Sequence, residues 1–567
     1  MLKLIPYPKN IQIKDGLLKN KYIKTFRGVN DERLISQIKK LPFDDNGATL
    51  IFNVENCDGE NYSICVQENQ IIVDAKGIKG AFYAIQTIRQ LLDNDVVPCL
   101  CLQDNPDFKY RGFYHDITRG KIPTLDTLKG LVDTLAYYKY NSLQLYVEHV
   151  YDFKETSEIV KRTGFISASE LKELDEYCKA NFMDFIPSLS TFGHMYEILM
   201  EEKYKGLRVK KDFANPVNKW AARMRHHTID PNNVYSIELV KSLIDQYCTN
   251  FTSDYFNICC DETFDLKEAY GEQSSQIYVE FVEQIIKHVV SKDKKVMMWA
   301  DILLAHPETI ELLPKDTLFL NWDYRPQPEK ENVDKFKQLN RSQIVCPGTW
   351  SWNNFCEDVL DSEPNICKMA EYGYENGAMG MLVTNWGDYN NICSLELSQY
   401  GLVLGAEKCW NPTRVIDEKF YNSVDFITYK CDKGVKLLRL LNSLQLNVSW
   451  SDFCYYATHT FANKEVDPRA IYSIEFIQEK QKQYLEFTEQ LNSLDGDFGD
   501  FKKEMELAAK GIMLIIEANA KLSKKSLAQS VVDYKTWLDE YSSLWLKKNK
   551  PSELYRIIEL FEKVFTR

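Results

Sequence analysis

Between residues 107 and 411 the chain alternates short apolar runs with longer stretches whose apolar residues recur at helical spacing. This alternation is typical of strand–helix units that build a parallel sheet. Amphipathic stretches such as 124–139 and 169–181 separate the runs. Eight runs are expected to be strands, at 110–116, 142–148, 184–190, 255–262, 295–302, 318–324, 343–350 and 380–387. The pattern therefore predicts a (β/α)8 barrel with insertions. A doubly wound open sheet is the main alternative, but no Gly-x-Gly-x-x-Gly or P-loop sequence follows any run.

The two flanks have different patterns. Residues 1–106 predict a small α+β domain, because short alternating runs precede a helical stretch that begins after glycines at 77 and 80. The alternating runs are at 10–14, 48–54, 62–67 and 70–74. Residues 412–567 read as mostly helical, with long 3.6-residue stripes over 470–494 and 499–525 and a last helix starting at Pro551.

We expect this C-terminal region to form a helical layer on the barrel rather than an independent binding domain. Trp410, Trp450, Trp537 and Trp545 are expected to pack within that layer. A homodimer contact through the same helices stays open.

Length and net charge limit the number of cores and the classes of binding partner that we expect. A length of 567 residues requires more than one core, and a net charge of −13 argues against nucleic acid or anionic membrane as the main partner. No run of 18 apolar residues predicts a membrane span, and Pro6, Pro8 and Lys9 interrupt the N-terminal apolar stretch, so no signal peptide is expected.

The 15 cysteines are scattered, and several lie inside apolar runs, as Cys259, Cys260 and Cys346 do. This usage predicts reduced thiols that pack in cores and hence a cytoplasmic protein. Cys99 and Cys101 lack a second cysteine pair at zinc-finger spacing, and the pair His226-His227 lies in a polar segment and is expected to be exposed. The spacing therefore argues against a metal site, and no organic cofactor is expected.

The ends of the predicted strands carry polar and aromatic residues, and in a barrel those ends form the catalytic face. Five of the ten tryptophans lie there, which core packing alone does not explain. Tryptophan faces bind the C–H faces of sugar rings, while carboxylates and arginine bind hydroxyls. The pattern predicts a carbohydrate site drawn from Arg111, Asp116, Arg119, Glu148, His149, His194, Asp261, Glu262, Trp299, Asp301, Trp322, Asp323, Tyr324, Trp350, Trp352, Trp386 and Asp388.

The run from Tyr255 ends on two adjacent carboxylates, Asp261 and Glu262. Neighbouring residues on a strand point to opposite faces, so both can reach one site only if the strand ends between them. Such a pair suits two distinct roles, one protonating a leaving group and the other orienting another group. Substrate-assisted glycoside hydrolases do without the usual second carboxylate.

At these residues the chain resembles the family 20 glycoside hydrolases, the β-N-acetylhexosaminidases, as a divergent subgroup. The similarity covers about residues 1–410, including the stretch 80–91, which looks like the family's domain before the barrel. It is carried by Tyr110-Arg111-Gly112 with Asp116 and Arg119, by Thr191-Phe192-Gly193-His194, by Asn257 to Glu262, and by Asn385-Trp386-Gly387-Asp388. Asn257, Cys259 and Cys260 stand where the family motif His-x-Gly-Gly-Asp-Glu has histidine and two glycines.

The resemblance implies a retaining, exo-acting reaction in which the 2-acetamido oxygen of the substrate attacks the anomeric carbon. Glu262 would be the general acid and base, and Asp261 would hold the acetamido N–H. Tyr324 and a residue near Trp350–Trp352 are the candidates for the acetamido carbonyl. Arg111 and Asp388 would bind hydroxyls. The remaining implied contacts are Trp299, Trp322, Trp350, Trp352, Trp386 and Glu148, with His194 and Asp116 supporting them from behind.

The implied substrate is a glycan with a terminal β-linked N-acetylglucosamine, with N-acetylgalactosamine left open. Two alternatives stay open at this point: a non-catalytic glycan-binding protein on the same scaffold, and a β-glycosidase with two separated carboxylates.

Overall fold

The computed structural model describes residues 2–210, 222–223, 227–494, 498–525 and 530–566. Its centre is a closed barrel of eight parallel strands in the order β10-β11-β12-β13-β14-β7-β8-β9. The strands are β7 Tyr110–Asp116, β8 Ser142–Val147, β9 Asp184–Leu189, β10 Tyr255–Asn257, β11 Lys295–Trp299, β12 Leu318–Trp322, β13 Gln343–Cys346 and β14 Gly380–Asn385. The predicted (β/α)8 barrel, with its flanking α+β and helical parts, is confirmed.

Strand β10 stops at Asn257, earlier than the predicted run to residue 262. Cys259, Cys260 and Glu262 have φ angles of +57°, +67° and +51°. Extended backbone requires negative φ, so the strand cannot continue through these residues. The early end leaves Asp261 and Glu262 in a loop above the barrel.

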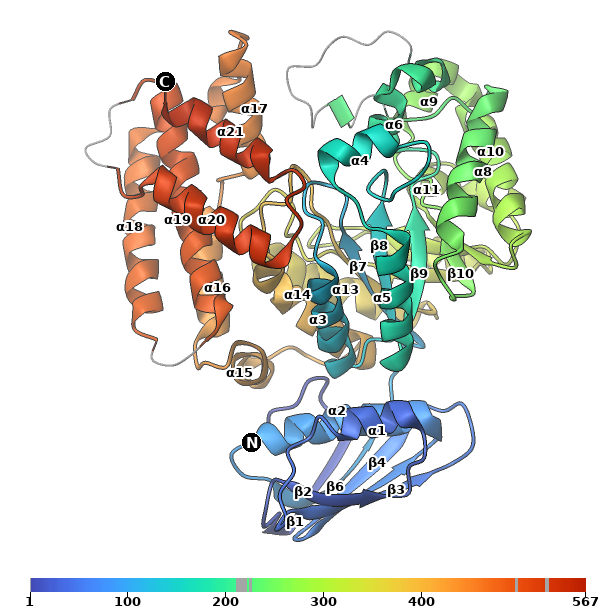
Figure 1. Cartoon of the computed structure of the whole chain (residues 1–567), viewed down its shortest axis with the longest axis vertical. Coiled ribbons are helices and arrows are strands. Elements are labelled where there is room, and N and C mark those ends of the chain that lie inside the picture. The colour runs from blue at the N-terminus through green and yellow to red at the C-terminus, as the bar shows by residue number, and fades with distance from the viewer. Residues whose placement is uncertain (1, 211–221, 224–226, 495–497, 526–529, 567) are drawn as a thin grey trace.

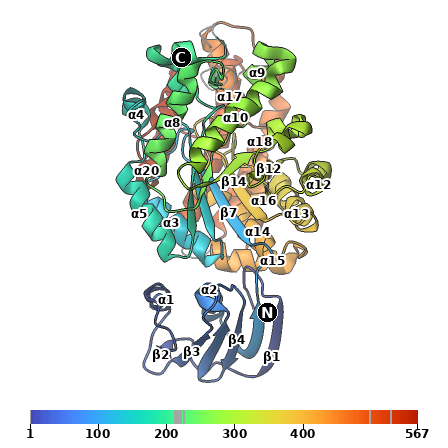
Figure 2. The same cartoon turned by 90° about the vertical axis from the view of Figure 1, so that its right-hand side faces the viewer.

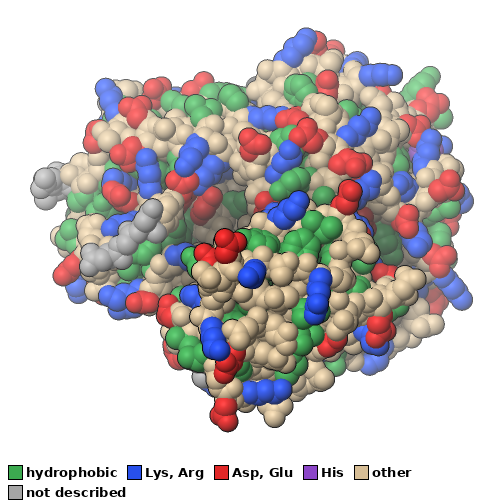
Figure 3. Space-filling view, turned by 60° about the horizontal axis from the view of Figure 1, so that its bottom comes forward, with side chains coloured by type: hydrophobic (Ala, Val, Ile, Leu, Met, Phe, Trp, Pro, Cys, Tyr) green, Lys and Arg blue, Asp and Glu red, His purple; other side chains and the backbone are tan. Residues whose placement is uncertain are grey.

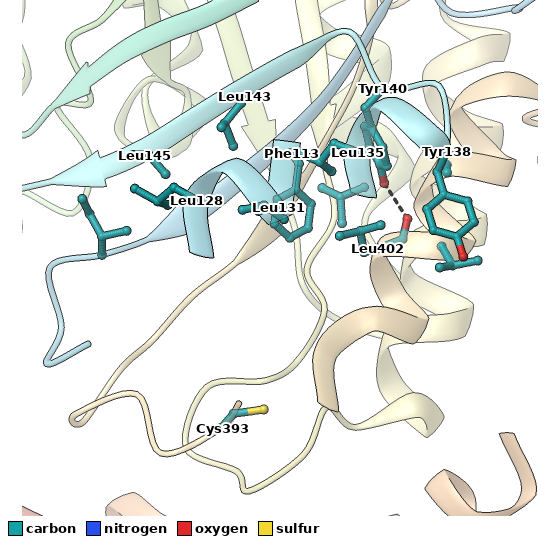
Figure 4. Close-up of a cluster of buried hydrophobic side chains, with 14 of the residues drawn as sticks. Phe113, Leu128, Leu131, Leu135, Tyr138, Tyr140, Leu143, Leu145, Cys393 and Leu402 are labelled. Carbon is teal, nitrogen blue, oxygen red and sulfur yellow. Dashed lines mark hydrogen bonds between the residues drawn. The ribbon is translucent and has the colours of Figure 1, made fainter. Parts of the chain in front are cut away.

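Helices cover the outside of the barrel (Figure 1). Figure 4 shows how Leu128, Leu131 and Leu135 of α3 pack over Phe113 and Leu143 of the neighbouring strands. The helices of this part are α3 Leu125–Tyr137, α4 Ser157–Thr163, α5 Ala168–Ala180, α6 Tyr196–Met200, α8 Val234–Cys248, α9 Phe264–Tyr270, α10 Ser274–Val290, α11 Asp301–Ala305, α12 Lys330–Gln338, α13 Val359–Glu375 and α14 Gln399–Trp410.

The N-terminal part is a six-stranded sheet in the order β1-β6-β4-β5-β3-β2. Its elements are β1 Asn10–Leu17, β2 Ile23–Arg27, α1 Glu32–Ile38, β3 Ala48–Val54, β4 Tyr62–Gln67, β5 Gln70–Ala75, α2 Gly77–Asp93 and β6 Pro98–Asp104. Alternate residues such as Ile64, Val66 and Val73 are buried, as a sheet covered on one face requires. Helices α1 and α2 cover the face that looks toward the barrel (Figures 1 and 2).

One cysteine pair departs from the expectation of reduced thiols. Cys65 on β4 and Cys101 on β6 are register partners and form a disulfide, with their Cα atoms 4.2 Å apart. Directly opposed residues on antiparallel strands come within bridging distance, which the linear sequence does not reveal. The other thirteen cysteines are free, and all of them except Cys57 and Cys367 are buried.

The C-terminal helices pack against the barrel as a layer, as predicted. Asn442 on α16 donates to the carbonyl of Glu357, and Tyr541 on α20 donates to the carbonyl of Ile392, both in barrel loops. These helices are α15 Glu418–Val424, α16 Gly434–Gln445, α17 Trp450–Phe461, α18 Ile474–Asn492, α19 Asp500–Leu522, α20 Tyr534–Lys548 and α21 Leu554–Phe565. The last helix, α21, begins at Leu554, three residues after the predicted start at Pro551.

Trp450, Trp537 and Trp545 are buried in this layer. The prediction for Trp410 was wrong. It ends α14, packs edge-on against Tyr83 of α2 with ring centres 5.3 Å apart, and donates to Asp104. Trp410 therefore belongs to the contact between the barrel and the N-terminal part.

Acidic and basic side chains are interspersed over the described surface in Figure 3. None of the described helices is both long and apolar enough to cross a membrane. Within the described residues, no group of three or more His, Cys, Asp and Glu side chains is arranged to hold a metal ion.

Candidate active site

A cavity of about 180 Å³ lies at the carboxyl ends of the barrel strands. Its lining residues come from the carboxyl ends of seven of the eight strands or from the loops that follow them, as expected for the catalytic face of such a barrel. They are Arg119, His194, Asp261, Glu262, Trp299, Trp322, Tyr324, Trp352, Trp386 and Asp388. The sequence placed all of them at the predicted site, and gave each except Arg119 a substrate-binding, catalytic or supporting role.

Asp261 and Glu262 both reach the cavity because β10 ends before them. They approach the same imidazole: Nε2 of His194 lies 3.5 Å from Oδ2 of Asp261 and 3.2 Å from Oε2 of Glu262. The backbone of Gly193 packs so tightly on this turn that a Cβ there would lie 2.3 Å from the carbonyl oxygen of Asp261. Glycine at 193 is thus required by close approach of two loops.

The charges of this group shift its proton affinities. Burial alone would lower the pKa of His194, but the Asp261 and Glu262 carboxylates outweigh it and raise that pKa to about 10. Burial would likewise raise the pKa of Glu262, but the hydrogen bond from His194 and its charge bring it below its ordinary value. His194 and Glu262 therefore form an ion pair at neutral pH.

His227 was expected to be exposed, and that prediction was wrong. Its side chain is fully buried, and its Nδ1 accepts a hydrogen bond of 2.6 Å from the backbone N–H of His194. Burial, followed by the neighbouring His194 charge, lowers the pKa of His227 to about 3, so the ring is neutral and can accept. His226 lies outside the described residues.

Arg119 is the arginine of the cavity. Its guanidinium lies 2.7 Å from Asp388 and 3.2 Å from Asp116, and 3.7 Å from Glu148. Asp116 is fully buried and also accepts from the backbone N–H of Gly387, so it joins the loops after β7 and β14. The sequence signal for Arg119 was its place just beyond the carboxyl end of a strand.

Arg111 does not reach the cavity, so its predicted grip on sugar hydroxyls was wrong. It is the second residue of β7 and pairs in register with Met381 near the start of β14, at the opposite end of the barrel. Its guanidinium lies 2.9 Å from a Glu60 carboxylate oxygen and 2.7 Å from the Tyr83 hydroxyl. Arg111 joins the barrel to the N-terminal part.

Aromatic rings form much of the wall. Trp299 and Trp386 have ring centres 5.8 Å apart, and Trp386 Nε1 donates a hydrogen bond of 2.7 Å to the Tyr324 hydroxyl. Tyr324 also stacks on Trp322 with ring centres 4.9 Å apart. This arrangement fixes four aromatic side chains and the Tyr324 hydroxyl in the wall that Asp261 also lines.

Two predicted substrate contacts lie behind the lining instead. Trp350 stacks on Trp352 at 4.9 Å and donates through Nε1 to the Tyr324 carbonyl, so it supports the wall. Glu148 is buried and accepts from the Tyr146 hydroxyl at 2.9 Å. Burial would raise its pKa, but His149 and Arg119 lower it to about 2. Glu148 therefore supplies a fixed negative charge behind Arg119 and His194.

Two further features were not found from the sequence. Oδ1 of Asp261 is buried without a hydrogen-bond partner among the described residues. Asp301, at the start of α11, accepts a hydrogen bond of 2.9 Å from the backbone N–H of Glu262. A buried acceptor that no described residue pairs with, beside this cavity, suits a site that pairs with a substrate N–H or O–H.

Known proteins share this architecture and sequence pattern. Residues 108–412 match the family described as Glycosyl hydrolase family 20, catalytic domain, and residues 37–105 match its domain 2. The chain belongs to glycosyl hydrolase family 20. The family resemblance noted from the sequence is thereby confirmed.

Relatives in family 20 are distant. The Beta-hexosaminidase of Akkermansia muciniphila is 30% identical over 164 residues, which cover 25% of this chain and 33% of that protein. The Beta-hexosaminidase of Vibrio furnissii is 20% identical over 429 residues, covering 64% and 66% of the two chains. The chain thus spans between a third and two thirds of the length of these two relatives. The solved structure of Flavobacterium johnsoniae chitobiase shares the fold over 99% of both chains, with a TM-score of 0.64 at 16% identity.

Proposed function

We propose that the protein is an exo-acting, retaining β-N-acetylhexosaminidase that uses substrate-assisted catalysis. Its substrate would be a glycan ending in β-linked N-acetylglucosamine. Support comes from the family 20 catalytic domain and from relatives named beta-hexosaminidase. The observation that carries the proposal is the pairing of Asp261 and Glu262 beside an aromatic-walled cavity of the size of one sugar.

The charge pattern favours substrate assistance over two separated carboxylates. A retaining two-carboxylate enzyme needs a free nucleophile across the cavity from its acid. Besides Asp261 and Glu262, the cavity is lined by one carboxylate, Asp388, which is ion-paired with Arg119 at 2.7 Å. A carboxylate held in this pair suits hydroxyl binding better than attack on an anomeric carbon.

In the proposed reaction, Glu262 gives its proton to the glycosidic oxygen as the bond to the anomeric carbon breaks. The 2-acetamido oxygen of the substrate forms the new bond to that carbon, giving an oxazolinium ion and releasing the alcohol. Glu262 then takes a proton from water, whose oxygen bonds to the anomeric carbon as the bond from that carbon to the acetamido oxygen breaks, with net retention of configuration. The proton that Glu262 needs is the one it shares with His194, 3.2 Å away.

Asp261 and Tyr324 would orient the acetamido group. The unpaired Oδ1 of Asp261 is positioned to accept the acetamido N–H and to stabilise the positive charge that develops there. The Tyr324 oxygen accepts from Trp386, and its O–H would donate to the acetamido oxygen. Trp299 and Trp386 would then enclose the methyl group.

The first test compares 4-nitrophenyl β-N-acetylglucosaminide with the matching β-glucoside, using wild type, Glu262→Gln and Asp261→Asn. We expect hydrolysis of the acetamido sugar only, and a loss of on the order of 10³-fold in kcat in both variants. Equal hydrolysis of both sugars would contradict substrate assistance and favour a two-carboxylate glycosidase. Binding of N-acetylglucosamine without hydrolysis by the wild type would favour a glycan-binding protein.

The proposal also covers the cellular location of the protein and its oligomeric state. We expect a cytoplasmic protein, because eleven buried free thiols suit a reducing compartment, although the Cys65–Cys101 disulfide is more typical of an oxidising one. Titration of free thiols in protein taken directly from cells would decide whether that bond forms there. Light scattering would test the homodimer contact through the C-terminal helices, which the sequence leaves open.

A further inference from the structure

The turn that carries Glu262 is held in a conformation that its residues do not favour. Glu262 has a φ of +51°, and Cys259 and Cys260 precede it with φ of +57° and +67°. Residues other than glycine occupy this left-handed region at a cost of roughly 1–2 kcal/mol each. Such a turn persists only where surrounding contacts hold it in place.

Contacts to the backbone of this turn come from several elements. The Tyr278 hydroxyl on α10 donates 2.7 Å to the carbonyl of Cys260, and the Trp299 N–H donates 3.0 Å to the carbonyl of Cys259. At the catalytic residue itself, the N–H of Glu262 donates 2.9 Å to Oδ2 of Asp301. Asp301 is thus the side chain that fixes the peptide plane leading into Glu262.

Asp301 reaches this position because β10 and β11 are neighbours in the barrel. Phe256 pairs in register with Val296, and the chain then turns into α11 immediately after β11. Asp301 is not among the residues that line the cavity. Its hydrogen bond is to Glu262, so it would act on the reaction through the protein rather than by touching the substrate.

Keeping a carboxyl group at this place is unfavourable for the fold. Oδ1 of Asp301 is buried without a partner among the described residues. Burial, followed by the negative charge of Asp261, raises the pKa of Asp301 to about 7. A costly acid with one hydrogen bond, made to the backbone of a catalytic residue, is typical of a functional role rather than of packing.

We propose that Asp301 is a positioning residue for acid catalysis: its hydrogen bond to the Glu262 N–H aims the Glu262 carboxyl at the glycosidic oxygen. This inference rests on the proposed function of Glu262. It predicts that losing Asp301 harms proton donation more than it harms binding or the fold.

The dependence of rate on the leaving group separates these effects. A 2,4-dinitrophenyl glycoside departs without a proton, whereas a methyl glycoside requires one from the general acid. In Asp301→Ala we expect kcat/KM to fall by roughly 10²-fold for methyl β-N-acetylglucosaminide. For the dinitrophenyl substrate we expect a fall of about threefold or less, since acid catalysis contributes little there.

Two variants complete the design. Asp301→Asn keeps an amide oxygen that can accept from the Glu262 N–H, so it should restore most of the activity on the methyl glycoside. If Asp301→Ala does not fold, Asp301→Ser replaces it, because its hydroxyl is too short to reach that N–H.

Asp425→Ala is the matched control. Asp425 is also a buried carboxyl that accepts from a backbone N–H, that of Val435 at 2.7 Å, and its pKa is likewise raised by burial, but it lies in the C-terminal layer. Its loss should destabilise the protein and leave the ratio of the two rates unchanged.

An equal loss on both substrates in Asp301→Ala, or no rescue by Asp301→Asn, would overturn the role of Asp301. Wild-type protein that hydrolyses neither acetamido substrate would instead overturn the proposed function itself. The two failures are therefore distinguishable in one set of measurements.

Discussion

Nε2 of His194 lies 3.2 Å from Oε2 of Glu262, and the two side chains share one proton between them. In the resting state that proton is on His194, because the pKa of His194 is raised to about 10 and that of Glu262 is lowered. General acid catalysis needs it on Glu262. In the proposed mechanism, transfer within the pair would supply this proton.

The first prediction follows from this shared proton. The pair keeps one proton from below the ordinary glutamate pKa of 4.5 up to the His194 pKa of about 10. Activity should therefore decline on the alkaline side only as pH approaches 10. In His194→Ala the alkaline decline should move toward neutral or acidic pH, because Glu262 alone then holds the proton. The measurement is kcat/KM against pH for both proteins.

The half-buried His288, which pairs with Asp245 far from the cavity lining, provides the control variant His288→Ala. An alkaline limb at the same pH in His194→Ala would contradict the shared proton. The same shift has a stability consequence. His194 has a folded pKa above its unfolded value, so its contribution to stability is complete below about pH 6.5 and is lost as pH rises toward 10.

Replacing Arg119 should lower catalytic efficiency, whereas replacing Arg111 should lower the stability of the fold. Arg119→Ala removes the cavity arginine and should lower kcat/KM by on the order of 10²-fold, since hydrogen bonds to charged groups contribute about 1.5–3 kcal/mol each. Arg111→Ala should lower the free energy of unfolding by about 3 kcal/mol, because Glu60 and Tyr83 lose a buried partner. Its kcat/KM should stay unchanged.

Urea unfolding and steady-state kinetics on both variants give the comparison. The reverse outcome, with lost turnover in folded Arg111→Ala and unaltered turnover in Arg119→Ala, would show that the two arginines have been assigned to the wrong ends of the barrel.

Because the backbone at Cys260 is left-handed, a glycine variant should be more stable there than an alanine variant, the reverse of the usual order. At an ordinary position glycine is less stable than alanine by about 0.5–1 kcal/mol. At Cys260, with φ of +67°, Cys260→Gly should be more stable than Cys260→Ala by about 1 kcal/mol, because glycine removes the Cβ strain. The measurement is the urea midpoint of each variant.

Cys346 is the control for this comparison, because it is also a buried free cysteine but belongs to strand β13. There, alanine should be the more stable replacement. The same order at both positions would mean that backbone strain at Cys260 is negligible.

Gly193 should be required for turnover. A Cβ at this position would lie 2.3 Å from the carbonyl oxygen of Asp261, so Gly193→Ala must displace the turn that carries Asp261. A shift of about 1 Å in a catalytic group can cost roughly 10²-fold in rate. We expect kcat to fall by that order in folded protein, checked by circular dichroism and kinetics.

Gly130→Ala on α3 is the matched control. A Cβ there meets no atom within 4 Å, so alanine should keep activity and stabilise the helix slightly. Wild-type kcat in Gly193→Ala would mean that the two loops can separate without disturbing Asp261.

The sequence by itself determined the barrel, its eight strand positions and most of the cavity lining. Apolar periodicity is local, and the strand-end rule converts a position along the chain into a position in space. The tryptophans at 299, 322, 352 and 386 and the pair Asp261-Glu262 were found in this way.

Only the tertiary structure decided that Arg111 contacts the N-terminal part instead of the cavity. It likewise decided that His227 is buried under His194 and that Cys65 pairs with Cys101. It also decided that Asp301 binds the Glu262 backbone. Each of these outcomes depends on a partner that lies 33 or more residues away in the chain. Local pattern encodes a residue's own conformation and burial, whereas such pairings arise from how distant segments pack, which no single window of sequence contains.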